Sequence, residues 1–176
     1  MFNSLVEKRR SIRRYKDKKV EQDKVSRLIE AALCAPSSMG HTPWEFIIVD
    51  DRDTLEKLSK AKAHGASFLK NAPLAIVVCA DPAKSDVWVE DAAISAVFIQ
   101  LAAEAMGLGS CWIQIRKRMH EDGKSASRHV KDLLQIPDNL EVQCFIAAGY
   151  PDETKPARKK EDLLYERVHK GSYGKQ

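Results

Sequence analysis

The sequence lacks the short motifs that mark the commonest nucleotide-binding and hydrolytic sites. It contains no GxxxxGK(S/T) phosphate loop, no HExxH zinc motif and no GxSxG nucleophile elbow. Gly107 and Gly109 do not make a dinucleotide fingerprint, because the third glycine is missing and the pair follows a predicted helix instead of a strand. No conventional phosphate loop, metalloprotease centre or hydrolase elbow is therefore predicted.

Cysteine and histidine are few and scattered. The four cysteines form no CxxC pair and each lies in an apolar run, which is typical of buried, reduced thiols in a cytoplasmic protein. No two of the five histidines have the spacing of metal ligands on one helix. The sequence therefore predicts neither a disulfide framework nor a metal site. These residues are Cys34, Cys79, Cys111, Cys144, His41, His64, His120, His129 and His169.

Neither charge nor apolar residues are concentrated in long blocks. The 29 lysines and arginines interleave with 25 aspartates and glutamates, and a net charge of +4 spread in this way disfavours a nucleic-acid-binding face. The longest apolar run, near residues 92–106, is interrupted by Ser95, Gln100 and Glu104, so we expect a buried helix instead of a membrane span. No apolar segment follows the charges of the N-terminus, so no secretory signal is predicted. The 176 residues fit one domain in the cytoplasm.

Apolar periodicity and turn residues divide the chain into about five helices and four strands. Val25, Leu28 and Ile29 begin the apolar face of an amphipathic helix, which ends before Pro36 because the residue preceding a proline disfavours helical angles. The strands are separated by helices, which indicates α/β or α+β character. Helices are predicted at 3–9, 23–35, 54–62, 87–106 and 125–134, and strands at 44–49, 74–79, 110–115 and 142–148.

The helix predicted at 87–106 is rich in alanine and apolar on nearly every side. Such a helix must be enclosed by protein. It therefore lies either at the centre of the molecule or at a subunit interface. The tail from Asp152 is charged and long for a small domain, and we expect it to wrap a neighbouring molecule.

A basic run near the N-terminus places four arginines around Ser11. Arginine presents a planar fork of donors that fits phosphate, and the serine hydroxyl adds another donor. If the chain is extended from residue 11, then Arg9, Ser11 and Arg13 project to one side and form a compact anion pocket. The alternatives are a solvated basic segment, or a nucleic-acid contact at 9–19 that would show a steep salt dependence.

Three further segments carry candidate functional residues, and each has an ordinary alternative. The loop at 35–44 joins a helix to a strand and offers hydroxyls and free backbone groups, although it has the composition of a simple turn. The segment at 107–114 contains Trp112, which fits a strand in the core equally well. The basic cluster at 155–160 is uninformative by itself, because charged tails are usually solvated.

The order of these segments carries more information than any one of them. RRSIRRY is followed by APSSMGHTPWEF, then by EDAAISAVFIQLAAEAMGLGSCWI, and finally by GYP and KPARKK. From about Leu5 to Lys160, this order resembles the nitroreductase-like family of FMN enzymes. The resemblance implies an α+β fold in which helices flank a central, mostly antiparallel sheet. It also implies an intertwined homodimer with two FMN molecules in clefts between the subunits, with 1–176 as one domain and 152–176 as a tail around the partner.

The resemblance also implies roles for individual residues. Arg9 and Ser11 match contacts to the phosphate and ribityl chain, and Arg13 matches the basic residue near the N1 and O2 edge of the flavin. Members of the family often carry an asparagine and a glutamine where this chain has Gly40, His41 and Thr42, so Gly40 and His41 are expected at an altered substrate face. The remaining cofactor contacts implied are Arg10, Pro36, Ser37, Ser38, Trp112, Ile113, Gln114, Arg158 and Lys159.

The activity implied by the resemblance is transfer of two electrons from NADH or NADPH through the flavin N5 atom to an electron-poor acceptor, such as a nitroaromatic or a quinone. No side chain is expected to act as a nucleophile or metal ligand, because the flavin carries the chemistry. Two alternatives stay open. The same fold supports reductive dehalogenation or flavin breakdown, and a non-enzymatic flavin carrier would bind FMN without being reduced by NAD(P)H. Neither nucleic acid nor a membrane is an expected partner.

Overall fold

A four-stranded antiparallel sheet forms the centre of the molecule. The computed structural model describes residues 2–175. The strands are β1 (Trp44–Val49), β2 (Leu74–Ala80), β3 (Gly109–Gln114) and β4 (Glu141–Gly149), in the order β1-β2-β4-β3 with every neighbouring pair antiparallel. Every residue of β2 is buried, as expected of a central strand covered on both faces. All four predicted strands are confirmed to within a residue or two.

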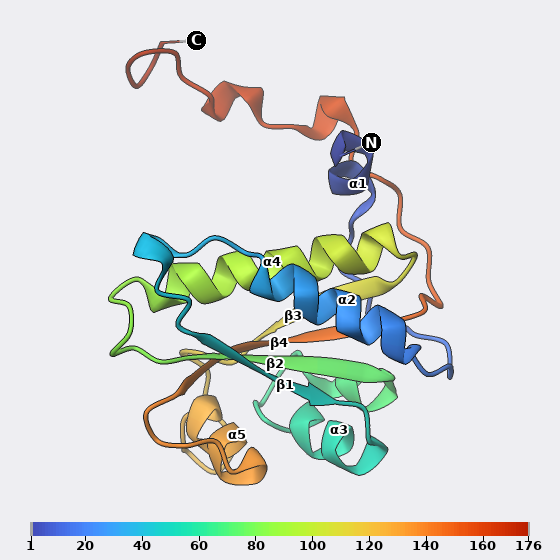
Figure 1. Ribbon diagram of the computed structural model, residues 1–176. Coiled ribbons are helices and arrows are strands. Elements are labelled where there is room, and N and C mark those ends of the chain that lie inside the picture. Colours follow the sequence, from blue (N-terminus) through green and yellow to red (C-terminus); the bar gives the residue numbers. More distant parts are fainter. Residues whose placement is uncertain (1, 176) are drawn as a thin grey trace.

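Helices cover both faces of the sheet, which gives the α+β architecture that the sequence predicts. Figure 1 shows α2 and α4 on one face and α3 and α5 on the other. Strand alternation explains the two layers of core, since Ile76 and Val78 point to the α2–α4 side while Val77 and Cys79 point to the α3–α5 side. The helices are α1 (Phe2–Lys8), α2 (Gln22–Leu33), α3 (Arg52–Ser59), α4 (Trp88–Ala105) and α5 (Ala126–Leu134).

The long helix α4 is covered on only part of its circumference. Ala96 and Ile99 are fully buried between the sheet and α2. Ile94 and Val97 remain 38% and 44% exposed, and together with Ala93 and Phe98 they line a wholly apolar hollow. The apolar residues on all sides of α4 predicted that protein would cover the whole helix. A single chain covers only part of its surface. Among residues 2–175, none of the helices is both long and apolar enough to cross a membrane.

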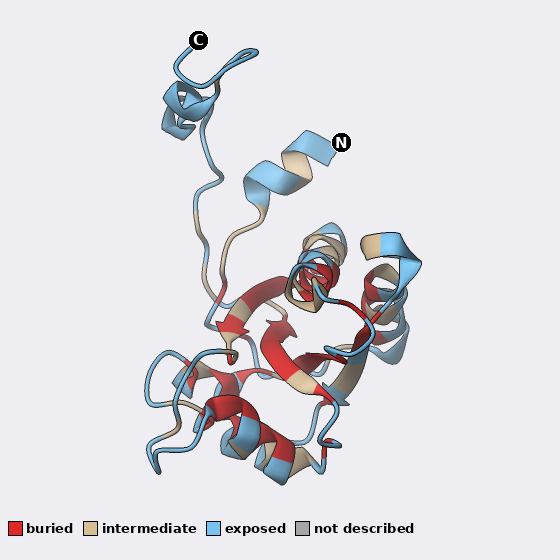
Figure 2. Ribbon diagram, turned by 90° about the vertical axis from the view of Figure 1, so that its left-hand side faces the viewer, coloured by how far each residue is buried: buried red, intermediate tan, exposed pale blue. Residues whose placement is uncertain are grey.

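The two ends of the chain extend together from the body of the molecule. Helix α1 and the tail beyond residue 158 stand apart from the sheet layers (Figures 1 and 2), and most of their residues are exposed. They are joined where the Arg158 amide donates a hydrogen bond of 2.9 Å to the Glu7 carbonyl. Several large apolar side chains are left in solvent there: Phe2, Val6, Leu164, Tyr165, Val168 and Tyr173. Exposed apolar surface of this kind commonly marks an interaction site.

Candidate functional site

The basic run lies beside the first residues of β3. The Ile12 amide donates a hydrogen bond of 2.9 Å to the Ser110 carbonyl, and Ser11 pairs with Ser110 in a parallel bridge. Buried Ile12 and Tyr15 anchor the run, and the Tyr15 hydroxyl donates a 2.6 Å bond to the Ile12 carbonyl. A side chain at Gly109 would meet Ile12 at 2.8 Å, so the close approach of the two segments depends on glycine there.

Arg9, Ser11 and Arg13 all act electrostatically on the thiol of Cys111, the second residue after Gly109 on β3. Burial raises the pKa of Cys111, and the positive charges of Arg13 and Arg9 together with the Ser11 side chain act in the opposite direction. Because Ile12 points into the core, its neighbours at 11 and 13 point away from it. Ser11 and Arg13 therefore lie on the side of the extended segment opposite Ile12, whereas Arg9 precedes that segment and its amide bonds back to the Leu5 carbonyl of α1.

Glu153 holds the backbone of this segment in place. Its carboxylate accepts hydrogen bonds of 2.5 Å from the Arg13 amide and 3.3 Å from the Arg14 amide. The Arg13 amide is the principal cause that lowers the pKa of Glu153, and the Lys155 ammonium, 3.6 Å away, lowers it further. The guanidinium of Arg13 itself remains exposed and lies 5.9 Å from the centre of the Phe68 ring.

Arg10, Arg158 and Lys159 lie apart from that group. The Arg10 guanidinium donates a hydrogen bond to the Pro156 carbonyl, so it ties the basic run to the tail. Arg158 and Lys159 are exposed and line a groove of about 340 Å³ between α1 and the tail, which also includes Tyr165. Within a single chain, the structure does not bring Arg158 or Lys159 to Cys111.

The predicted loop around Ser37 and Ser38 is held at the beginning of α4. The Ser38 amide donates a 2.8 Å hydrogen bond to Asp91, whose other carboxylate oxygen accepts a 2.8 Å bond from the Ser85 hydroxyl. Ser37 accepts a 2.9 Å bond from the Thr42 amide, which closes the loop on itself. Asp91 is only 2% exposed and was not predicted as a functional residue.

The rest of the predicted loop is open to solvent. Pro36, Gly40 and His41 are exposed. Met39 and Thr42 adopt positive φ angles of 49° and 42°, which is uncommon for residues with a side chain. The loop therefore presents a firmly held, locally strained backbone with His41 free at its surface.

The loop and the basic run lie at opposite ends of α4. Ser38 contacts Asp91 in the first turn of this helix, whereas Ser11 pairs with Ser110, which follows its C-terminus. A helix of 18 residues is about 27 Å long. Within one chain, the two predicted groups of ligand contacts are therefore far apart.

The residues predicted on β3 divide between the two faces of the sheet. Trp112 and Gln114 share the face of α4, where the Trp112 ring nitrogen donates a 2.9 Å hydrogen bond to the Gln114 amide oxygen. The Gln114 amide nitrogen in turn donates a 2.9 Å bond to the Arg116 carbonyl. Ile113 is 1% exposed and packs in the opposite core, so only its backbone is available to a ligand.

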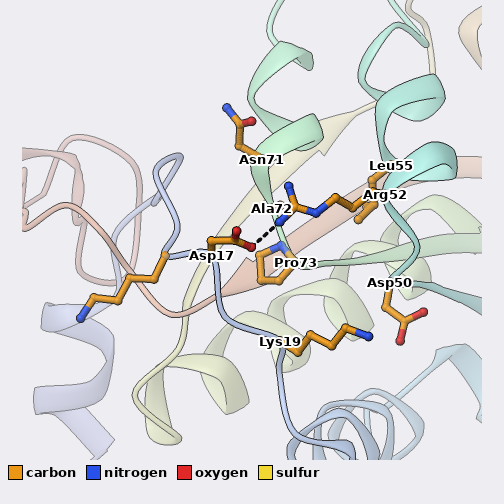
Figure 3. A pocket seen from close by; sticks show the side chains of 9 residues that line it. Asp17, Lys19, Asp50, Arg52, Leu55, Asn71, Ala72 and Pro73 are labelled. Atoms are coloured by element: carbon orange, nitrogen blue, oxygen red, sulfur yellow. Dashed lines mark hydrogen bonds and ion pairs between the residues drawn. The ribbon is translucent and has the colours of Figure 1, made fainter.

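A separate charged pocket lies close to the basic run but contains none of the predicted site residues. Figure 3 shows its lining, including an ion pair between Asp17 and Arg52, with Asn71 nearby. Its volume is about 100 Å³. Pockets for cofactors usually measure roughly 300–1,000 Å³, so this one is too small for a flavin.

Comparison with known families decides the identity of this arrangement. The nitroreductase family matches the chain over residues 6–67 and 60–150. The chain belongs to the nitroreductase family. It is therefore an enzyme of the nitroreductase type, an oxidoreductase, and the resemblance inferred from its ordered segments is confirmed.

Individual relatives of this nitroreductase align with it over nearly their whole length. A solved FMN-dependent nitroreductase from Clostridium difficile R20291 is 50% identical, with a TM-score of 0.94 over 96% of this chain and 98% of the other. A protein of Archaeoglobus fulgidus named "Putative NADH dehydrogenase/NAD(P)H nitroreductase" is 36% identical over 171 residues, covering 94% of this chain and 95% of its own. An iodotyrosine deiodinase of Thermotoga neapolitana is 26% identical, covering 93% of this chain and 96% of its own.

Two lysines that the sequence did not single out also interact electrostatically with Cys111. The Lys155 ammonium donates a hydrogen bond to the Ser11 carbonyl, and its charge acts on the Cys111 thiol. Lys62 is half-buried, and burial followed by the charge of Arg118 lowers its pKa, with Cys111 also acting on it. The sequence places Lys155 in a charged tail and gives no sign of its contact with Ser11. Lys62 lies in an irregular stretch whose pattern carries no signal.

Proposed function

We propose that this nitroreductase binds FMN and passes two electrons from NADH or NADPH through the flavin N5 atom to an electron-poor small molecule, such as a nitroaromatic or a quinone. The observation that carries the proposal is the convergence of Arg9, Ser11, Arg13 and Lys155 beside β3. A phosphorylated cofactor needs this set of charged and hydroxyl donors. The FMN-dependent relative that is 50% identical supports the choice of cofactor.

The donor set fits the two charged parts of FMN. Arg9, Ser11 and Lys155 suit the terminal phosphate and the ribityl hydroxyls, because each offers a donor on the same side of the segment. Arg13, held through its backbone by Glu153, suits the N1 and O2 edge of the ring, where negative charge develops on reduction. When bound, FMN supplies the redox chemistry by taking hydride at N5 and returning two electrons to the acceptor.

The outer edge of β3 suits the flavin ring. Apart from the bridge at Ser110, no strand among residues 2–175 pairs with that edge, so its backbone donors are available to a ligand. We assign Trp112, Ile113 and Gln114 to the passage beside the ring, with a backbone N–H near Gln114 orienting N5. Gly40 and His41 are assigned to the substrate face.

A second copy of the chain completes this site in the proposal. The loop with Pro36, Ser37 and Ser38 lies about 27 Å, the length of α4, from the basic run of its own chain. It reaches a flavin at that run only if it comes from a partner. The uncovered face of α4 and the apolar side chains of the tail supply surface for a homodimer in which 152–176 wraps the partner, and Arg10, Arg158 and Lys159 contribute from that tail junction.

Within this proposal the 176 residues act as one domain in the cytoplasm. Four free cysteines, three of them buried, fit a reducing compartment. The proposed partners are a second copy and a small electron acceptor, with neither nucleic acid nor membrane involved.

An absorbance spectrum tests the proposal directly. We expect the purified protein to be yellow, and its flavin bands to bleach when NADH or NADPH is added without oxygen. A colourless protein that takes up no added FMN would contradict flavin binding. A yellow protein that neither nucleotide bleaches would be a flavin carrier and not an NAD(P)H oxidoreductase.

Reductive dehalogenation is a second candidate reaction at the same site. Two observations favour it: the exposed His41 in a loop that lacks the usual amides, and the similarity to an iodotyrosine deiodinase. Iodotyrosine and a nitroaromatic are offered separately to the reduced protein under anaerobic conditions. Release of iodide faster than reduction of the nitroaromatic would favour this candidate, and no iodide release would remove it.

A further inference from the structure

A cluster of two imidazoles and a carboxylate lies outside the proposed flavin site. The ligand atoms of His120, Asp122 and His129 are all within 4.8 Å of one another. The two imidazole rings stack with their centres 3.8 Å apart and their planes inclined by 10°. Among residues 2–175, this is the one such group of three or more histidine, cysteine or acidic side chains.

The turn that carries His120 and Asp122 is closed by its own backbone. Met119 and Ser125 pair in an antiparallel bridge, and the His120 amide donates a 2.9 Å hydrogen bond to the Lys124 carbonyl. The Lys124 amide donates a 2.9 Å bond to the Asp122 carboxylate. Two ligands are therefore held in place by the turn itself and need little ordering on binding.

The third ligand comes from a helix that begins where this turn ends. Ser125 caps α5, since its hydroxyl accepts a 3.1 Å bond from the Arg128 amide. The His129 amide donates a 3.1 Å bond to the Ser125 carbonyl, which places His129 in the first turn of α5. The turn and the helix thus converge on one point from two directions.

His120 and Asp122 are already close enough to share a ligand. His120 Nδ1 lies 2.9 Å from an Asp122 carboxylate oxygen. A neutral imidazole with its proton on Nδ1 makes this contact as an ordinary hydrogen bond, whereas the Asp122 amide, 3.2 Å from the same nitrogen, uses it as an acceptor. A metal ion would replace that proton. Two ligands bound tetrahedrally to zinc at 2.0–2.1 Å are about 3.4 Å apart, so a metal ion fits between these two atoms after a small adjustment.

We propose that His120, Asp122 and His129 form a Zn²⁺ site that ties the turn after β3 to α5. Two imidazole nitrogens and one carboxylate oxygen suit a borderline ion such as Zn²⁺, whereas Mg²⁺ and Ca²⁺ prefer oxygen ligands. Water occupies the remaining coordination position. Because parallel stacked rings do not share an in-plane point, one imidazole turns as the metal binds and the stack opens.

Of the cationic side chains nearby, Lys124 opposes positive charge at His129, and the carboxylates of Asp122 and Asp132 offset it. Arg128 is paired with Asp132 and Asp138 at 2.8 Å each, and Lys124 lies 3.8 Å from Asp132. The sequence predicted no metal site because nine positions separate the two histidines and no helix presents both. The turn at 119–125 brings them together.

Zinc binding to tag-free protein, freed of metal with a chelator, tests the proposal by isothermal titration calorimetry. We expect one Zn²⁺ per chain, a rise in melting temperature with Zn²⁺ and none with Mg²⁺, and visible absorption bands when Co²⁺ is used instead. His120→Ala and His129→Ala are each expected to weaken zinc binding by at least roughly 10–100-fold, the loss that even indirect partners of a metal cause. His169→Ala, in the tail, is the matched control and should bind zinc as the wild type does.

Circular dichroism confirms that each variant is folded, and His129→Gln provides a second variant of similar size. The proposal is overturned if the wild type takes up no zinc at micromolar concentration. It is equally overturned if the folded His120 and His129 variants bind zinc as tightly as the His169 control. FMN binding is measured separately on the same samples, so failure of the zinc site leaves the flavin proposal untouched.

Discussion

Single residues determine the positive charge of the surface beside β3. Arg9, Arg13 and Lys155 act together on Cys111, although they come from the two ends of the chain. We propose this surface as the phosphate-binding part of the site. Hydrogen bonds to a charged group contribute about 1.5–3 kcal/mol each, so the loss of a single donor should be measurable.

Arg9→Ala and Lys155→Ala are each expected to weaken FMN binding by roughly 10–150-fold, from the value of one charge-assisted bond. Fluorescence titration of the apoprotein with FMN measures the change. Arg14→Ala is the control, because the Arg14 side chain is exposed and has no assigned contact with the cofactor. Equal FMN affinity in the wild type and in both variants would remove the proposed phosphate contact.

Glu153 makes the backbone of the basic run sensitive to acid. The Arg13 amide lowers the pKa of Glu153 below its ordinary value. A depressed pKa in the folded state means that the carboxylate stabilises the fold above the ordinary glutamate pKa, and that this contribution is lost as the pH falls through the lowered value. The tether between the basic run and the tail should therefore persist at neutral and mildly acidic pH.

We expect the amide resonance of Arg13 in NMR spectra to titrate with a midpoint below the ordinary glutamate pKa. Glu153→Gln should abolish that titration, since an amide does not ionise in this range. A midpoint at or above the ordinary value would show that the carboxylate does not hold the Arg13 amide in solution.

At the scale of elements, the start of α4 positions the loop assigned to the flavin and substrate. Asp91 links the Ser38 amide to the Ser85 hydroxyl and is almost completely buried. Truncation of such a partner leaves two donors without acceptors, which costs more than the bond itself. The loop should therefore be more sensitive to Asp91 than to its own exposed residues.

Asp91→Ala is expected to speed hydrogen exchange at the Ser38 amide by at least roughly tenfold, which corresponds to about 1.4 kcal/mol of local stability. Asp91→Asn keeps one acceptor and should show a smaller change. A merely global loss of stability would raise exchange in the core strands equally, so exchange in β2 is the internal reference. No change at Ser38 would contradict the positioning role.

The contact between the basic run and β3 depends on the absence of a side chain at Gly109. An added methyl group would meet Ile12 at 2.8 Å on atoms close to the backbone. We expect Gly109→Ala to lower the free energy of unfolding by about 1–3 kcal/mol, as overpacking does, and to weaken FMN binding. Urea unfolding measures the first effect, with Ser110→Ala as the neighbouring control. A Gly109→Ala protein as stable as the wild type would show that the two segments do not need this approach.

At the scale of the whole molecule, one chain leaves its longest helix incompletely covered. Ile94 and Val97 form an exposed apolar face on α4, and the tail adds a second exposed apolar surface. The loop and the basic run also lie too far apart to act on one ligand within a chain. The homodimer that we propose would cover α4 and bring the loop of one chain to the basic run of the other.

Val97→Glu is expected to shift the protein from dimer to monomer and to reduce its FMN content. Ile48→Glu is the matched control, because Ile48 on β1 is apolar and 45% exposed, close to the 44% of Val97. Light scattering coupled to size-exclusion chromatography measures the mass of each. A wild-type monomer, or a Val97→Glu dimer with full FMN content, would contradict the dimer proposal.

Much of the local structure follows from the sequence. Short runs of apolar, aromatic and β-branched residues predict all four strands, because the residues of a strand that face the core follow one another closely in the chain. The long helix is recognised in the same way, and Pro36 limits α2, which ends at Leu33. The position of Ser11 and Arg13 on the side of the extended segment opposite Ile12 also needs nothing beyond local geometry.

Contacts between distant segments depend on how the elements pack. Lys155 reaches Ser11 across 144 positions because the tail returns beside the basic run. The roles of Lys62 and Asp91 depend in the same way on contacts between segments that are distant in the chain, so the sequence alone did not reveal them. The sequence by itself determined most of the elements and the family, because apolar periodicity is local and the order of the motifs can be followed along the chain. Only the tertiary structure decided which residues meet, because strand order and helix packing bring together atoms that no spacing in the chain connects.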